Sequence, residues 1–249
     1  MLYLGPAKQK QRRLPGDPDV TDWPQHFARL ATQAHNPALQ QYYQAGIPAG
    51  DSSIAEAPLL AMDFETTGFE PGRDGIVSIG TVPMSLQRIH SSQARHWLVK
   101  PKFALTGQSV VVHGITHSAI EAAPDITDIL PELLQQMAGK VVVVHFRGIE
   151  RPFLHATLLD RLNEGIEFPV IDTMELEARL HRARPPSLLD KLLGREPVSI
   201  RLADSRRRYG LPDYRPHDAV TDALACAELL QAQIADRFRP DTLLSELWR

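Results

Sequence analysis

Four consecutive valines, Val141 to Val144, constrain the fold of this chain more than any other feature of its sequence. β-Branched residues favour strands, and a run that is apolar at every position has no polar face to turn toward water. Gly139-Lys140 before the run and His145 after it limit the run to the length of one strand. The pattern predicts a central strand that is buried on both faces, as in sheets that helices cover on both sides.

Strand and helix patterns alternate along the rest of the chain. Strands come first, and Gly72-Arg73-Asp74 predicts a turn that makes the first two of them antiparallel neighbours. Helical spacing then alternates with short apolar strands, which predicts an α/β domain with a mixed β-sheet flanked by α-helices. The predicted strands cover residues 59–64, 75–83, 96–99, 141–144 and 170–171, and the predicted helices cover residues 118–122, 126–136, 150–163, 173–182 and 218–237.

Residues 1–56 differ from the domain that follows and are interpreted as a partly helical N-terminal extension that packs on it. Asp22 can cap a first helix, and a second helix is predicted at residues 37–44. The main domain is assigned to residues 57–237 and a C-terminal tail to residues 238–249. Four basic residues near the start are interpreted as a solvated tail, with a nucleic-acid contact as the alternative: Lys8, Lys10, Arg12 and Arg13.

The composition excludes several classes of protein. Hydrophobic residues make up 43% of the chain and charged residues 23%, as in a globular domain with a buried core. No apolar run reaches the ~20 residues that a membrane span needs, and no apolar stretch follows the basic N-terminus, so a cytoplasmic location is expected. The single cysteine, Cys226, excludes an internal disulfide and a thiolate zinc cluster. Because the net charge is −3, nucleic acid would have to be bound by local basic patches.

Two acids stand at the end of the first predicted strand, where an unpaired charge would be costly. Asp63 and Glu65 are two residues apart, so their side chains project from the same face of the strand. Ligands of α/β sheets bind at the carboxyl ends of strands, and carboxylate oxygens suit Mg²⁺ or Mn²⁺. A pair of surface acids is the alternative interpretation. Thr66-Thr67-Gly68 favours a ligand site, because it adds hydrogen-bond donors and a glycine that can turn against a ligand.

Two further acids have surroundings that suggest a site. Glu150 follows the valines in the first turn of a predicted helix, where it either faces Asp63 or only interacts with the helix dipole. Asp222 lies five residues after His217, in a helix that Asp218 is expected to cap. Asp222 either faces inward among apolar residues, which would require a cation to meet it, or lies on the solvent face.

In order and spacing, these three stretches resemble the exonuclease motifs of the DnaQ-like (DEDDh) 3′–5′ exonuclease family, which includes the proofreading subunit of bacterial DNA polymerase III. The first motif covers residues 63–68, and the third is His217 with Asp222. The resemblance covers residues 57–235. Two more stretches resemble further landmarks of the family: His113-Gly114-Ile115-Thr116 and Ile171-Asp172-Thr173.

The resemblance implies a ribonuclease H-like fold and hydrolysis of phosphodiester bonds from the 3′ end of single-stranded nucleic acid. It also implies two divalent cations, Mg²⁺ or Mn²⁺, and His217 as the general base, since an ordinary histidine pKa of ~6.5 suits proton transfer near neutral pH. DNA is expected rather than RNA as the substrate, and the sequence does not identify a polymerase or repair partner. The metal ligands that the resemblance implies are Asp63, Glu65, Glu150 and Asp222.

The resemblance further implies a pocket that holds the terminal nucleotide. Phe69 would stack on a base there, and His145 either lines the pocket or has a structural role at the strand end. The stretch Arg201 to Arg215, predicted as a loop, either grips the phosphate backbone or is simply solvated. The remaining pocket residues are Thr66, Thr67 and Gly68.

The second motif departs from the family pattern. The family usually has His-Asn-Ala, two residues and then Asp, whereas here His145-Phe146-Arg147 leads to Glu150, which is one methylene longer. Glu150 either still reaches the second metal, which is the favoured interpretation, or holds it weakly. The main hypothesis is therefore a metal-dependent 3′–5′ exonuclease. The alternatives are a catalytically attenuated nucleic-acid-binding accessory module and a small-molecule phosphodiesterase on the same fold.

Overall fold

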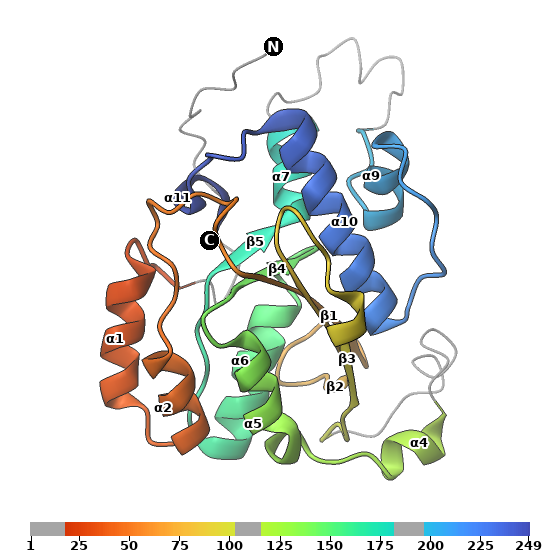
Figure 1. The fold of residues 1–249 in the computed structure, drawn as a ribbon. Helices are drawn as coiled ribbons and strands as arrows, with labels where there is room; N and C mark the ends of the chain where they lie inside the picture. The colour runs from red at the N-terminus through yellow and green to blue at the C-terminus, as the bar shows by residue number, and fades with distance from the viewer. Residues whose placement is uncertain (1–17, 103–115, 182–196) are drawn as a thin grey trace.

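Five strands form one mixed sheet in the computed structural model, which describes residues 18–102, 116–181 and 197–249 (Figure 1). The strand order is β3-β2-β1-β4-β5. β1 pairs antiparallel with β2, as predicted, and parallel with β4, so the sheet is mixed and the predicted architecture is confirmed. The strands are β1 (Leu59–Thr66), β2 (Ile76–Met84), β3 (Arg95–Leu98), β4 (Val141–Val144) and β5 (Val170–Asp172).

Helices flank the sheet. α10 packs along β1 and β2, while α6 contacts α5 and the same two strands. α1 and α2 stand together at one side of the molecule, where α2 contacts α5 (Figure 1). The helices are α1 (Trp23–Gln33), α2 (Pro37–Gln44), α4 (His117–Glu121), α5 (Ile126–Met137), α6 (Glu150–Leu162), α7 (Thr173–His181), α9 (Leu202–Arg208), α10 (Ala219–Arg237) and α11 (Leu244–Leu247), with a 3-10 turn η1 (Ser91–Gln93).

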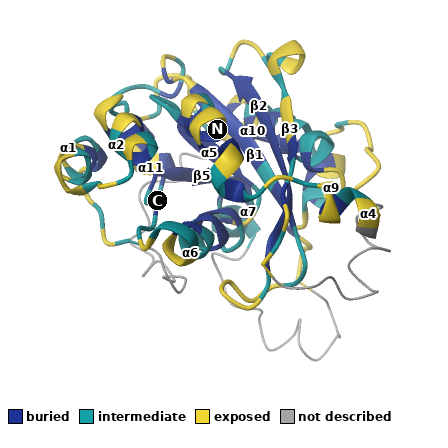
Figure 2. Ribbon diagram, turned by 90° about the horizontal axis from the view of Figure 1, so that it is seen from below, coloured by how far each residue is buried: buried dark blue, intermediate teal, exposed yellow. Residues whose placement is uncertain are grey.

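The central strands are buried on both faces (Figure 2). All four valines of β4 are fully buried, which confirms the strand that they predicted. In β1, Leu59 and Ala61 point to one face and Leu60 and Met62 to the other, and all four are fully buried. Within the described ranges, no helix combines the length and apolar character of a membrane span.

The N-terminal extension is built around aromatic side chains. Asp22 caps α1 by accepting a hydrogen bond from the backbone N–H of Gln25, as predicted. The ring of Phe27 in α1 lies 5.3 Å from that of Tyr42 and 5.2 Å from that of Tyr43, both in α2. These three side chains are buried, so the described part of the extension belongs to the hydrophobic core.

Trp23 joins the extension to α6. Its side chain is buried, and the guanidinium of Arg151 in α6 lies 5.7 Å from its ring centroid. We expect Trp23→Ala to lower the free energy of unfolding by about 3–5 kcal/mol, because a large side chain is deleted from a packed site. Urea denaturation measures the loss. The control is Leu159→Ala, at an exposed position of α6, with an expected change below about 0.5 kcal/mol; equal losses would contradict the packing role of Trp23.

The C-terminal segment, predicted as a tail, packs on the extension and on the sheet. The backbone N–H of Ile54 donates to the carbonyl of Thr242 at 2.9 Å. Arg249 exchanges two backbone hydrogen bonds with Val170 of β5, at 2.8 and 3.1 Å, and the neighbouring Trp248 is buried. Residues 238–249 therefore connect the linker before β1 to the outer edge of β5.

Candidate active site

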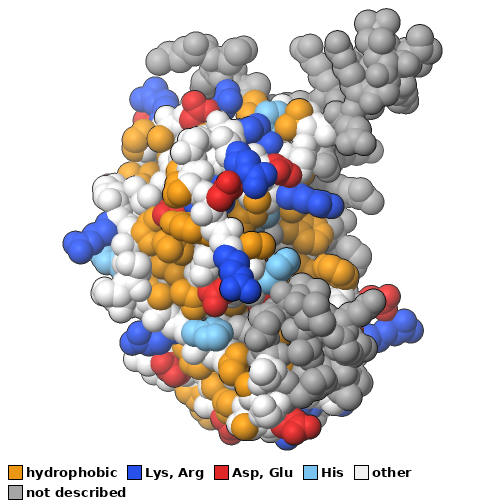
Figure 3. Space-filling model, turned by 90° about the vertical axis from the view of Figure 1, so that its right-hand side faces the viewer, with side chains coloured by type: hydrophobic (Ala, Val, Ile, Leu, Met, Phe, Trp, Pro, Cys, Tyr) orange, Lys and Arg blue, Asp and Glu red, His pale blue; other side chains and the backbone are white. Residues whose placement is uncertain are grey.

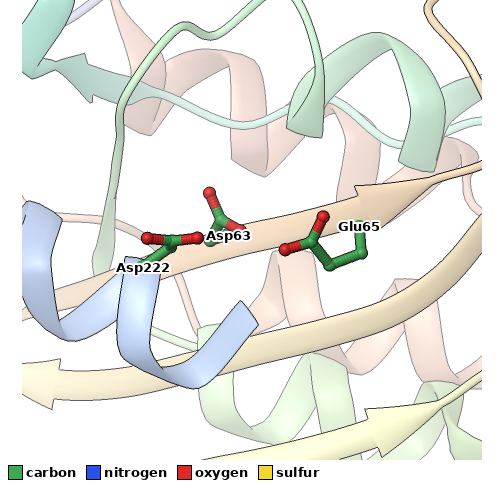
Figure 4. Close-up of side chains that lie close together, drawn as sticks. All are labelled: Asp63, Glu65 and Asp222. Carbon is green, nitrogen blue, oxygen red and sulfur yellow. The ribbon is translucent and has the colours of Figure 1, made fainter. Parts of the chain in front are cut away.

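Three carboxylates meet at the carboxyl end of β1 (Figure 4). Asp63 and Glu65 project from β1, and Asp222 projects from the first turn of α10. One carboxylate oxygen from each residue lies within 4.8 Å of the other two. The structure thus brings together three of the four predicted metal ligands, in a cluster that could hold a divalent cation.

α10 comes this close to the sheet because a glycine lies opposite Asp63. Gly80 of β2 is the antiparallel partner of Asp63. A Cβ atom at this position would overlap the carbonyl group of Ala219, the first residue of α10. Gly80 therefore lets the first turn of the helix lie directly on β2 and bring Asp222 to β1. Gly80 is not among the predicted site residues, although a glycine inside an apolar strand can mark such a close approach.

The same end of α10 places His217. Asp218 caps the helix by accepting a hydrogen bond from the backbone N–H of Thr221 at 2.8 Å, as predicted. His217 has a left-handed backbone conformation with φ at 70°, and its backbone N–H donates to Asp222 Oδ2 at 2.8 Å. His217 is exposed, so its residue position is fixed at the edge of the carboxylate cluster while solvent still reaches it.

Glu150, the fourth predicted carboxylate, is buried near the cluster. It is the first residue of α6, and its Oε2 has no hydrogen-bond partner among the described residues. Burial raises the pKa of Glu150 well above its ordinary value, and the negative charge of Asp172 adds to the rise. Burial likewise raises the pKa of Asp63, and the charge of Glu150 is the next cause. The two side chains therefore interact electrostatically across the site.

The loop that carries the second motif is held in place by hydrogen bonds to Asp172 at the end of β5. The carboxylate of this residue accepts hydrogen bonds from the backbone N–H groups of Phe146 and Arg147, at 3.0 and 3.1 Å. The buried guanidinium of Arg147 pairs with Asp172 at 3.3 Å and with Glu175 at 2.5 Å. Arg147 thus serves as the counter-ion of two carboxylates, one at the end of β5 and one in α7. The family pattern did not reveal this role, because the partners lie 25 and 28 residues further along the chain.

The loop after β1 is fixed by its own side chains. Thr66 Oγ1 donates to the carbonyl of Gly68 at 2.7 Å, and the backbone N–H of Gly75 donates to Thr67 Oγ1 at 3.0 Å. Asp74 accepts a hydrogen bond from the backbone N–H of Glu70 at 2.8 Å and braces the same loop. The two threonine hydroxyls therefore hold the backbone of the loop for which the sequence predicts nucleotide binding.

Phe69 and His145 are placed very differently. Phe69, at the tip of the loop, is 86% exposed, as a residue that stacks on a base would be. His145 Nδ1 lies 2.8 Å from Thr173 Oγ1, and its Nε2 lies 3.1 Å from the carbonyl oxygen of Ile200. Burial lowers the pKa of His145 to about 4, so its ring is neutral at pH 7. These contacts support the structural role that the sequence left open for His145.

Two of the arginines before His217 form ion pairs with residues of neighbouring helices, while Arg201, Arg207 and Arg215 are exposed. Helix α9 occupies much of the stretch 201–215, so the predicted loop is wrong there. Arg206 is buried and forms an ion pair with Glu228 at 2.7 Å, and Arg208 forms one with the buried Glu177 at 2.5 Å. Figure 3 shows basic and acidic side chains interspersed on the side of the molecule near α4 and α9. The described part of this side has no continuous basic surface.

Some of the sequence interpretations lie outside the described residues. They are the basic stretch Lys8 to Arg13 and the first three residues of the landmark His113-Gly114-Ile115-Thr116. Its last residue, Thr116, is described and caps α4. The other landmark, Ile171-Asp172-Thr173, lies at the junction of β5 and α7 and supplies the carboxylate that holds the second motif.

Comparison with known proteins identifies the family. The family model described as "Exonuclease" (RNase_T) matches residues 60–230. A DNA polymerase III PolC-type protein of Thermotoga petrophila is 30% identical over 179 residues, which cover 72% of this chain and 12% of the relative. A DNA polymerase III subunit epsilon-like protein of Rhodobacter capsulatus is 31% identical over 185 residues, or 72% of this chain and 25% of the relative. The chain therefore spans only a small part of these relatives.

A solved structure has the same fold. The nuclease domain of 3′hExo, described as a DEDDh family member bound to rAMP, superposes with a TM-score of 0.58. The sequence identity is 18%, and the match covers 72% of this chain and 92% of that domain. Sequence and fold agree with the resemblance drawn from the three motifs: the chain belongs to the exonuclease family, among the DnaQ-like members with a ribonuclease H-like fold.

Proposed function

We propose that the protein is a metal-dependent exonuclease that removes nucleotides from the 3′ end of single-stranded nucleic acid. The observation that carries the proposal is the convergence of Asp63, Glu65 and Asp222 beside the buried Glu150. Four carboxylates at one end of a strand repel one another and lose hydration, so this arrangement is unfavourable without cations or protons. A site of this kind suits divalent cations that also bind a phosphate.

The residues present fit such cations. The donor set is made of hard carboxylate oxygens, and Glu150 Oε2 is buried without a partner among the described residues. Asp63, Glu65, Asp222 and Glu150 would hold the ions. When bound, these ions would activate a water molecule and stabilise the leaving 3′ oxygen.

The chain itself supplies the remaining steps. His217, exposed at the edge of the cluster, would take the proton from the attacking water, and the hydrogen bond from its backbone to Asp222 keeps it in reach. The braced loop of Thr66 to Gly68 would position the terminal sugar and phosphate. Phe69 would stack on a base, a contact that tolerates any sequence.

We propose DNA rather than RNA as the substrate. The two relatives are named as DNA polymerase III proteins, and proofreading or repair next to a polymerase would fit that kinship. The structural neighbour bound to rAMP makes a ribonucleotide substrate the alternative. The test is a 5′-labelled oligonucleotide, as matched DNA and RNA strands, incubated with Mg²⁺ or Mn²⁺. A ladder of 3′-shortened products supports the proposal, and binding without shortening under either metal would overturn it.

A second candidate, an attenuated nucleic-acid-binding module, is favoured by the two departures from the family pattern: the longer Glu150 and the altered His145-Phe146-Arg147. In an active enzyme adapted to Glu150, we expect Glu150→Asp to cleave no faster than the natural protein, because the shorter side chain withdraws its oxygens from the site. Initial rates of oligonucleotide shortening measure the effect, with thermal unfolding as a check on folding. A gain of tenfold or more would instead show that the natural protein is attenuated.

A further inference from the structure

Phe146 has features that the active site described above does not explain. It is 38% exposed, one of few large apolar side chains of the described chain that reach solvent. It lies two residues after β4, at the end of the sheet where β1 carries Asp63 and Glu65. Because β1 and β4 are adjacent parallel strands, the loops that follow them leave the sheet at the same end. Phe69 follows β1 and Phe146 follows β4, so two exposed phenylalanines stand on the loops that flank the carboxylates.

The backbone of Phe146 is held in an unfavourable conformation. Its φ is 93°, a region that bulky residues rarely adopt because Cβ crowds the backbone. Hydrogen bonds fix it there: the N–H of Phe146 donates to Asp172 at 3.0 Å, and its carbonyl accepts from Ile149 at 3.1 Å. Glycine or asparagine would fit this conformation with less strain. Strain of this kind often lies at functional sites, where the surrounding structure maintains it.

The ring of Phe146 packs directly against Gly148. A Cβ atom at Gly148 would lie 2.6 Å from Cζ of Phe146, so any larger residue would push the ring away. The ring therefore rests on the backbone just before α6, two residues from Glu150, with part of its surface exposed. A ring that is already held in place loses little conformational entropy when a flat partner stacks on it.

We propose that Phe146 is a binding residue that stacks on a nucleobase near the 3′ end of the substrate, as a second aromatic platform beside Phe69. Nucleobases stack on aromatic side chains whatever their sequence, so the contact would add affinity without selecting a base. The proposal rests on the proposed function, because it takes the ligand to be single-stranded nucleic acid at the carboxylate site. It also gives a use to the phenylalanine that departs from the family's His-Asn-Ala pattern.

The first test separates binding from chemistry. We expect Phe146→Ala to raise KM for a short single-stranded oligonucleotide about tenfold, the effect of one lost base stack, with kcat changed less than about twofold. Phe146→Tyr is expected to keep the natural KM, whereas Phe146→Leu, which is apolar but not aromatic, is expected to resemble Phe146→Ala. Phe146→Asn tolerates the positive φ and guards against a folding defect. Leu159→Ala, at an exposed position of α6, is the control.

The second test locates the stacked base. Oligonucleotides with one abasic position near the 3′ end should bind the natural protein about tenfold more weakly at one position, and Phe146→Ala should lose that penalty at the same position. Dissociation constants measured with Ca²⁺ in an Asp63→Asn background give this result without hydrolysis. Failure of the proposed function would then appear as a natural protein that does not shorten DNA or RNA. An unchanged abasic penalty, or an unchanged KM in Phe146→Ala, would overturn the role of Phe146.

Discussion

Asp63→Asn is expected to abolish exonuclease activity, with a fall in kcat of about 10³-fold or more, and at the same time to stabilise the metal-free protein. The activity is lost because Asp63 lies between Asp222 and Glu65 in the carboxylate cluster (Figure 4), and the charge of Glu150 also acts on it. Stabilisation of developing charge at a metal site contributes several kcal/mol, and each 1.36 kcal/mol is a factor of ten in rate. Shortening of a 5′-labelled oligonucleotide measures the loss.

The gain in stability follows from the pKa of Asp63. Burial and the neighbouring acids raise this pKa in the folded protein, so the folded state holds the proton more tightly than the unfolded state does. Without metal, the free energy of unfolding therefore falls as pH rises from the unfolded pKa, ~3.9, toward the raised folded value. Asparagine carries no charge and removes this pH-dependent loss. In EDTA at pH 7, we expect a higher Tm for Asp63→Asn, by about 2–4 °C for each 1 kcal/mol of relieved repulsion.

The response to metal separates the two effects. Mg²⁺ or Mn²⁺ should raise the Tm of the natural protein more than that of Asp63→Asn, because the variant binds the ions more weakly. Asp51→Asn, an exposed acid before β1, is the control and should keep the natural activity and the natural metal response. Full activity in Asp63→Asn, or the same rise in Tm with metal in both proteins, would show that the carboxylate cluster is not the metal site.

Local patterns were sufficient to predict most of the fold. The four valines of β4 predicted a strand at the residues where it is found, and Asp22 and Asp218 cap the helices that they were expected to cap. These signals are local. The apolar pattern of a strand and the side chain that caps a helix both involve only residues that are close together in the sequence. β1 is two residues longer than predicted, to Thr66, because pairing with β2 continues past the charged Glu65.

Tertiary contacts account for what the sequence did not predict. Arg206 and Arg208 looked like part of a polar loop, but ion pairs with Glu228 and Glu177 hold them against the domain. In the same way, nothing near Arg147 in the sequence indicates that its partners are Asp172 and Glu175. The acids and histidine of the candidate site were predicted from the motifs that resemble those of the exonuclease family. The groups that hold them in place could not be predicted, because they lie on other elements of the fold.

Gly80→Ala tests the most consequential of these hidden contacts. The added methyl group would overlap the backbone of Ala219, and backbone cannot turn aside as a flexible side chain can. The first turn of α10 must then move away from β2 and take His217 and Asp222 with it. A displacement of about 1 Å at catalytic groups can cost about 10²-fold in rate, so we expect kcat to fall by that factor or more. Overpacking should also lower the free energy of unfolding by about 1–3 kcal/mol.

A matched glycine separates the lost geometry from the lost stability. Gly139 precedes β4 at the opposite end of the sheet from the carboxylates, has φ at 69°, and has open space where a Cβ would lie. Gly139→Ala should therefore cost about 1 kcal/mol through backbone strain alone and leave kcat unchanged. Both variants are assayed at a temperature well below their Tm, so that each is folded. If Gly80→Ala folds and cleaves at the natural rate, the position of α10 does not control the reaction. A loss confined to Gly80→Ala would show that catalysis depends on the contact between the first turn of α10 and β2.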